Sequence, residues 1–148
     1  MKMSALGFAA ALILGSIPIA KAGIVFTENF EGESLALNYN SFQQFSVTNG
    51  TVDLIGNGFF DFYPSQGRYV DLDGSTSNAG LLTTTNPFAA GTYTLNFVLG
   101  GSTRGDTNTI QVSLGDFAQD ITLASNAGLT NLSLTFQTTT AGTLSFKN

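Results

Sequence analysis

The sequence predicts a small all-β domain built as a two-sheet antiparallel β-sandwich. Three observations support this fold class. After residue 22, short segments alternate apolar and polar residues, which is the pattern of half-buried strands. Glycine, asparagine, aspartate and proline separate these segments, as turns require. No long stretch of the same region has helical periodicity. A closed barrel is the alternative, because periodicity does not count sheets.

The first 22 residues predict a cleaved signal helix. Lys2 supplies a positive start, residues 5–19 form an apolar core, and Ala20-Lys21-Ala22 places small residues before a cleavage point at Gly23. The apolar core is shorter than the roughly 20 residues of a membrane span, and glycine and proline interrupt it. We therefore expect export, a secreted or cell-surface location, and no stable membrane insertion after cleavage.

Cleavage leaves a single domain, residues 23–148, with ten acidic and three basic residues and a formal charge of −7. Such a domain lacks the cations that bind nucleic acid or an anionic membrane, so neither is an expected partner. The chain has no histidine and no cysteine, the commonest catalytic base and a favoured nucleophile. We expect no enzymatic activity. Without disulfides, core burial must supply the stability.

The segment 45–54 predicts a β-hairpin. Asn49-Gly50 at its centre is a preferred type I′ turn, because both positions of that turn need a positive φ. A two-residue loop would pair Val47 with Val52 and the two ends of the segment with each other. All apolar residues of the hairpin then lie on one face.

Further strands follow from the same alternation. Each places its apolar residues on one face and its polar residues on the other, so that in segment 68–73 Val70 and Leu72 point inward while Tyr69, Asp71 and Asp73 point outward. The segment 57–67 is dense in aromatic residues and reads as a loop or broken strand. The other predicted strands lie at 92–99, 109–114, 120–123, 132–136 and 144–146.

Several segments together carry a family resemblance. They read Glu28-Asn-Phe-Glu-Gly32, Gly67-Arg-Tyr-Val-Asp-Leu-Asp-Gly74, Phe88-Ala-Ala-Gly-Thr-Tyr-Thr-Leu-Asn-Phe97 and Leu132-Ser-Leu-Thr-Phe136. This pattern resembles bacterial secreted jelly-roll domains, similar to galactose-binding-like domains, of surface proteins sorted by a PEP-CTERM tail. The resemblance implies a sandwich of jelly-roll type and a non-catalytic structural or interaction role. It also implies partners in an extracellular matrix, such as a polysaccharide or surface matrix components.

The end of the chain departs from this family. Members continue past a segment such as Leu144-Ser-Phe-Lys-Asn148 with one more strand and then a Pro-Glu-Pro sorting tail, which this sequence does not contain. The resemblance therefore implies either a C-terminally truncated member or a protein that is released rather than retained. A missing strand would expose a sheet edge or leave part of the core uncovered.

Four carboxylates are candidate metal ligands. Glu28 and Glu31 lie near the start of the domain, and Asp71 and Asp73 form an Asp-x-Asp-Gly step. The resemblance implies a structural calcium held by the acidic residue of the Asn-Phe-Glu-Gly start and by a late aspartate. Calcium requires six to eight oxygen ligands, and only part of such a set is visible here. The competing interpretation is that all four carboxylates are solvated.

Aromatic residues offer a second candidate site, for carbohydrate. Phe59, Phe60 and Tyr63 could form a stacking platform, with Arg68 bonding sugar hydroxyls. Phe62, Tyr39 and Phe42 extend the same cluster. The alternative is that these phenylalanines belong to the core, where phenylalanine is most often found. Arg104-Gly105-Asp106 spells an integrin-binding tripeptide, but between two strands glycine and aspartate are ordinary turn residues.

Overall fold

A computed structural model describes residues 23–148, which form nine β-strands and no helix. The predicted signal helix, residues 1–22, lies outside the described residues. No helix long and apolar enough to cross a membrane is found among residues 23–148. The strands are β1 (Phe45–Thr48), β2 (Asp53–Gly56), β3 (Arg68–Asp71), β4 (Leu81–Thr84), β5 (Gly91–Leu99), β6 (Asn108–Leu114), β7 (Phe117–Leu123), β8 (Thr130–Thr138) and β9 (Leu144–Lys147).

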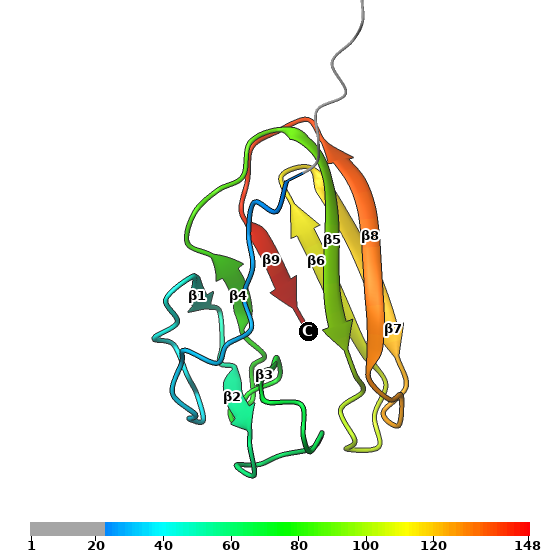
Figure 1. Ribbon diagram of the computed structural model, residues 1–148. Helices are drawn as coiled ribbons and strands as arrows, with labels where there is room; N and C mark the ends of the chain where they lie inside the picture. Colours follow the sequence, from blue (N-terminus) through cyan, green and yellow to red (C-terminus); the bar gives the residue numbers. More distant parts are fainter. Residues whose placement is uncertain (1–22) are drawn as a thin grey trace, which may run out of the picture.

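The strands form one large sheet and two small ones (Figure 1). The large sheet has the order β1-β4-β9-β6-β7, and the small sheets are the pairs β2-β3 and β5-β8. Every pairing between named strands is antiparallel. The all-β, antiparallel prediction is therefore confirmed. The large sheet ends at β1 and β7, so the structure is not the closed barrel of the alternative.

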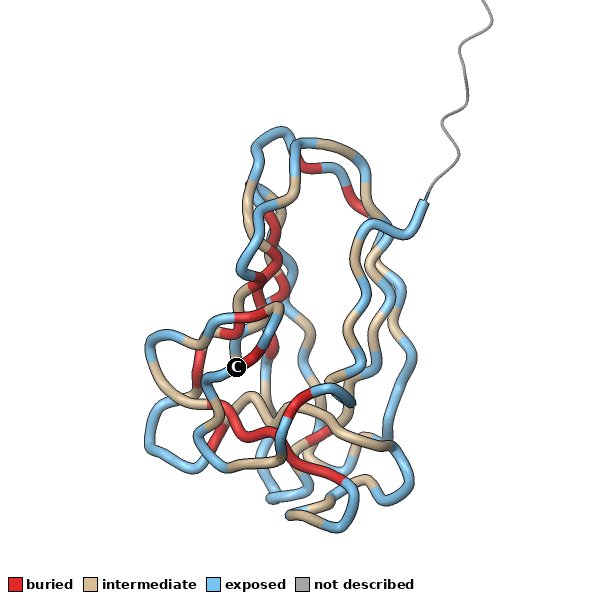
Figure 2. Tube along the Cα trace, turned by 60° about the vertical axis from the view of Figure 1, so that its left-hand side comes forward, coloured by how far each residue is buried: buried red, intermediate tan, exposed pale blue. Residues whose placement is uncertain are grey.

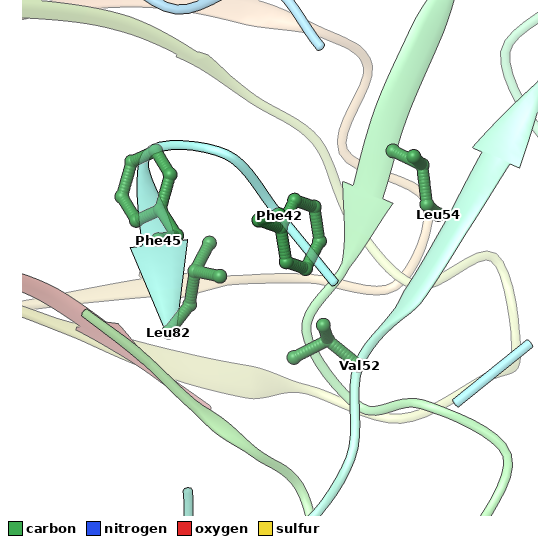
Figure 3. Packing of buried hydrophobic residues seen from close by; sticks show 5 residues of the cluster. All are labelled: Phe42, Phe45, Val52, Leu54 and Leu82. Carbon is green, nitrogen blue, oxygen red and sulfur yellow. The ribbon is translucent and has the colours of Figure 1, made fainter. Parts of the chain in front are cut away.

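The two small sheets pack on the large one through separate clusters of apolar side chains. Beneath β2-β3, one cluster holds five buried residues, labelled in Figure 3: Phe42, Phe45, Val52, Leu54 and Leu82. Four of them are from or beside β1, β2 and β4, so this cluster joins the small sheet to one end of the large sheet. The arrangement is sandwich-like, as the alternating strands predict.

Beneath β5-β8, a second cluster joins the other small sheet to β6 and β9. Its buried members are Val112, Leu114, Phe136 and Leu144. The rings of Phe117 and Phe136 stack with centroids 3.8 Å apart. The inner face of β5 is covered less completely, since none of its nine residues is buried, whereas all four residues of β2 are (Figure 2).

The predicted hairpin over 45–54 is wrong. β1 pairs with β4, Val47 opposite Leu82, while β2 pairs with β3, Leu54 opposite Val70. Asn49 has the expected positive φ of 61°, but Gly50 at 156° departs from a type I′ turn. The turn carries the chain from the large sheet to the small one, because each strand finds a longer-range partner whose apolar face matches its own.

The remaining strand predictions are largely confirmed. β5 alternates exposed and half-buried residues with Tyr93, Leu95 and Phe97 on the inner side, and β6 buries Ile110 and Val112. Segment 57–67 forms turns and bends, as expected. β4 was not anticipated, because its sequence, Leu-Leu-Thr-Thr, does not alternate.

Two buried carboxylates hold the N-terminal segment in place: Glu33 bonds within the segment, and Asp53 bonds the segment to β2. Glu33 is 5% exposed and accepts hydrogen bonds from the Tyr39 hydroxyl at 2.9 Å and the Gln43 backbone N–H at 2.7 Å. Asp53 in β2 is 3% exposed and accepts from the Asn38 N–H at 2.7 Å and the Ser75 hydroxyl at 2.5 Å. Each carboxylate has partners for both oxygens, which a buried polar group needs.

Candidate functional site

A groove of about 530 Å³ lies between β3 and β5 and is the candidate site. One wall is residues 68–73, which include β3, and the other is residues 96–102, from the end of β5 into the next loop. Ile110 from β6 and Asn148 at the C-terminus also line it. The groove thus occupies the place where the layer facing the large sheet is divided into two small sheets.

Each wall of the groove presents the edge of a strand. Within residues 23–148, β3 pairs with β2 alone and β5 with β8 alone. One edge of each strand therefore has no neighbouring strand, and residues of both strands line the groove. We call these the open edges of β3 and β5. A strand edge carries a row of N–H and C=O groups that are available for pairing with another chain.

Apolar side chains from both walls enter the groove lining. Val70 and Leu72 contribute from the β3 side, and Phe97 and Leu99 from β5; all four are half-buried. Ile110 is 6% exposed and lies beneath them on β6. The lining therefore offers apolar surface that the protein's own core covers only in part.

Arg104 joins the two walls at one end of the groove. It lies in the loop after β5, and its guanidinium contacts Asp71 at 2.6 Å and Asp73 at 3.1 Å. The same guanidinium lies over the ring of Phe62, 5.5 Å from the centroid. The Arg104 side chain thus makes three contacts within the protein. The arginine of the Arg104-Gly105-Asp106 tripeptide is therefore held against the protein surface.

Asp71 was expected on a solvated face but lies partly buried, with a side chain 16% exposed. Burial raises its pKa, and the neighbouring carboxylates of Asp53 and Asp73 add to that rise. The backbone N–H of Asp73 and the charge of Arg104 lower the pKa and so oppose the effect. The Asp71 side chain is therefore more buried than the solvated position that alternation predicts.

Arg68 lies in the groove lining but bonds mainly to the N-terminal segment. Its Nη1 donates to the backbone carbonyls of Glu31, at 2.6 Å, and Glu33. Its own N–H donates to the Glu31 carboxylate at 2.8 Å. Arg68, predicted as a carbohydrate-binding residue, thus lies in the groove lining with its guanidinium bonded to the N-terminal segment.

Two tyrosines line the groove with their hydroxyl groups already bonded. Tyr63 donates to the carbonyl of Gly101 at 2.6 Å, and Tyr69 donates to Asp61 at 3.0 Å. Tyr69 also accepts from the N–H of Tyr63 at 2.9 Å. Burial raises the pKa of both tyrosines. Their rings remain available to a ligand, while their hydroxyls hold the 57–67 loop in place.

The other predicted aromatic residues lie elsewhere. Phe59 and Phe60 pack edge to face, with centroids 4.9 Å apart, and neither lines the groove. Phe60 is 57% exposed, while Phe42 is buried in the core. The structure therefore brings Tyr63 and Arg68 together and leaves Phe59 and Phe60 outside the groove.

The four candidate metal ligands have other partners. Glu28 accepts from the N–H groups of Asn29 and Phe30 and from Gln44, Glu31 lies beside Arg68, and Asp71 and Asp73 contact Arg104. In the described part of the chain, no three acidic, histidine or cysteine side chains are grouped so as to hold a metal ion. Calcium binding stays a prediction without a visible ligand set.

Sequence reasoning did not find the groove itself. Its walls are more than 20 residues apart in the chain, and nothing local indicates that β3 and β5 face one another with their edges open. Comparisons with protein-family models, curated proteins and solved structures gave no match to this chain.

Proposed function

We propose that this chain is an exported, non-catalytic protein that acts outside the cell, or at its surface, as a structural or interaction protein of an extracellular matrix. The signal-like residues 1–22 support export, and the acidity of the domain disfavours nucleic acid as a partner. The resemblance to PEP-CTERM-associated surface proteins supports the same location. The interaction site that we propose is the groove between β3 and β5.

The observation that carries this proposal is the pair of open edges on one groove. Backbone edges and half-buried apolar side chains are typical of surfaces that bind another molecule. The carboxylates in the lining are bonded to neighbouring donors, which suits a fixed binding surface better than acid–base chemistry.

We also propose that the fold is a sandwich of jelly-roll type. The chain supports this by crossing repeatedly between the layers: β1, β4, β6-β7 and β9 belong to the large sheet, and β2-β3, β5 and β8 to the small ones. As a result β4 and β9, which are far apart in sequence, lie side by side. Such crossings are characteristic of Greek-key sandwiches.

Export is tested by expressing the full chain in a bacterial host and sequencing the N-terminus of the protein found outside the cytoplasm. We expect the sequence to begin at Gly23. An uncleaved chain retained in the cytoplasm would contradict the proposal.

The groove is tested by two variants that each add one positive charge to β5. Leu99→Lys alters the groove lining, and Thr94→Lys alters the exposed outer face of the same strand. In a host that secretes a polysaccharide matrix, we expect Leu99→Lys to reduce the matrix-bound fraction several-fold and Thr94→Lys to leave it unchanged. Equal retention of both folded variants would exclude the groove as the interaction site.

A carbohydrate-binding module is the second candidate function. The aromatic rings of Tyr63 and Tyr69 in the groove favour it, with Asn96 nearby as a hydrogen-bonding side chain. A structural calcium belongs to the same alternative. Thermal unfolding with millimolar calcium and with a panel of polysaccharides separates the candidates, because a ligand of the native state raises the unfolding midpoint. A rise with one polysaccharide would favour the carbohydrate module.

A further inference from the structure

We propose that the groove between β3 and β5 is a strand-acceptor site. It binds one extended peptide segment from another polypeptide, which hydrogen-bonds to the open edges of β3 and β5 and joins the two small sheets into one. This inference rests on the proposed function, in which the groove is the interaction site, and it names the class of partner.

The backbone of the two walls provides the hydrogen-bonding groups. In an antiparallel pair, successive residues direct their N–H and C=O groups alternately toward the partner strand and away from it. Every second residue of β5 therefore directs these groups away from β8, and every second residue of β3 directs them away from β2. Along the groove these lie within residues 96–99 of β5 and at Val70 of β3, since the outward N–H of Arg68 already donates to Glu31. A peptide strand presents a matching row on both of its own edges.

The side chains of the groove fit the alternating side chains of a strand. Residues that point inward from an inserted strand would meet Val70, Phe97, Leu99 and Ile110, which are apolar. Residues that point outward would remain in solvent. Such a strand would also cover Phe97 and Leu99, the half-buried inner residues of β5 that line the groove.

The charge of the groove selects among peptides. The charged residues that line it in the described structure are Glu28, Arg68, Asp71 and Asp73, and Arg104 contacts both aspartates, so the formal charge of the five is −1. A neutral or basic peptide is therefore favoured and an acidic one disfavoured. The side chains of Arg68, Tyr63 and Tyr69 already bond to protein acceptors. Two open backbone edges beside an apolar lining favour an extended peptide.

Cysteine protection tests the proposal, because the chain has no cysteine of its own. Leu99→Cys places one thiol in the groove, and Thr94→Cys places one on the outer face of the same strand. The probe is an eight-residue peptide that begins with lysine and then alternates valine and threonine. We expect it to slow alkylation of the folded Leu99→Cys protein at least threefold and to leave Thr94→Cys unchanged. Ser102→Cys, nearly isosteric and also in the lining, replaces Leu99→Cys if that variant does not fold.

Two further peptides separate strand pairing from simple apolar contact. A peptide with alternate threonines replaced by proline keeps the valines but loses backbone donors, and it should give no protection. A peptide that begins with glutamate should protect less than the lysine peptide. Equal protection by the proline peptide would overturn the strand-acceptor model.

The remaining outcomes distinguish the inference from the proposed function. Protection by a neutral polysaccharide and not by the peptide would overturn the strand acceptor and leave the groove as an interaction site. Protection that grows with protein concentration alone would identify a second copy as the occupant and overturn the separate-partner proposal. No protection by any probe, together with equal matrix retention of Leu99→Lys and Thr94→Lys, would overturn both proposals.

Discussion

Arg104 in the loop after β5 contacts Asp71 at the end of β3, with 2.6 Å between Nη2 and Oδ2. This ion pair ties together the two walls of a groove whose strands do not pair with each other. It explains how the two small sheets, β2-β3 and β5-β8, keep a defined distance from each other at that end of the groove.

The first prediction concerns this pair. Replacing Arg104 by Met removes the positive charge that lowers the pKa of Asp71, so that pKa, already raised by burial, should rise further. NMR titration of the Asp71 carboxyl carbon measures it. The free energy of unfolding should fall by about 1 kcal/mol or less, since the guanidinium is partly exposed. An unchanged pKa of Asp71 would show that the ion pair does not form in solution.

The pH dependence of the Asp71 contribution follows from the direction of its pKa shift. Because folding raises the pKa, the folded state holds the proton more tightly than the unfolded chain does. The stabilising contribution of this carboxyl group is therefore fully present below its unfolded pKa, near 3.8. It is lost as the pH rises through the pKa of the folded state. In Asp71→Asn, the pH dependence of the thermal unfolding midpoint should lose this contribution. Asp73→Asn, which changes the other carboxylate in contact with Arg104, should retain it.

The second prediction concerns Asp116 in the turn between β6 and β7. It accepts hydrogen bonds from the Thr138 hydroxyl at 2.6 Å, the Thr139 N–H at 2.8 Å and the Thr139 hydroxyl at 2.5 Å. These bonds hold its pKa well below the usual value of 3.8. The contribution to stability is therefore present above about pH 4 and is lost as the pH falls below that value.

Asp116→Asn should accordingly lower the unfolding midpoint at pH 7, and its difference from the parent should shrink toward pH 2. Asp120→Asn is the control, because its side chain is exposed and accepts one bond from Gln111 at 3.1 Å. Equal effects of the two substitutions at pH 7 would contradict the assigned network.

The third prediction tests the turn that replaced the expected hairpin. A Cβ on Gly50 would lie 2.4 Å from the carbonyl oxygen of Ala79 and 2.5 Å from that of Asn78, and the φ of 156° is unfavourable for other residues. Gly50→Ala should therefore destabilise the protein by about 1–3 kcal/mol. At the exposed tip of a hairpin, the same Cβ would meet open space.

Gly128→Ala is the matched control, since its Cβ would meet nothing within 4 Å. Chemical denaturation of both variants measures the difference. A cost for Gly50→Ala no larger than that for Gly128→Ala would support the hairpin after all.

The fourth prediction concerns the core in Figure 3. Leu54 is fully buried between β2-β3 and the large sheet, and Leu54→Ala should lower the free energy of unfolding by about 2–5 kcal/mol. Leu37→Ala, at a residue 37% exposed, should cost well under half of that. Similar losses at both positions, measured by denaturant titration, would mean that Leu54 does not lie in a packed core.

The sequence predicts those parts of the fold that depend on local pattern. Alternation places Tyr93, Leu95 and Phe97 on one face correctly, because a strand's period of two determines which side chains share a face. It fails for strand pairing: the apolar side chains of Val47 and Leu54 suit a hairpin, yet Val47 pairs with Leu82 and Leu54 pairs with Val70. Pairing depends on distant segments, and the four residues of β4 carry no alternation to reveal them.

The candidate site was predictable only in part. Tyr63 and Arg68 line the groove, but Phe59 and Phe60 do not, since Phe59 is hydrogen-bonded to Gly56 at the end of β2. Asp53, which alternation places on an outer face, is buried instead, since the N-terminal segment covers that face and supplies the Asn38 donor. Burial of this kind is a property of the assembled layers and has no local signal.

The most direct measurement of the central claim is amide hydrogen exchange, by NMR, along β3, β5 and β9. If β3 and β5 have open edges, the amide of Val70 and every second amide of residues 96–99 should exchange rapidly, while Arg68, whose N–H donates to Glu31, and β9, which has a strand on each side, should be protected. The strand-forming lysine peptide should slow the rapid amides selectively. Uniform protection of β3 and β5 in the free protein would contradict the open edges, and with them the proposed site.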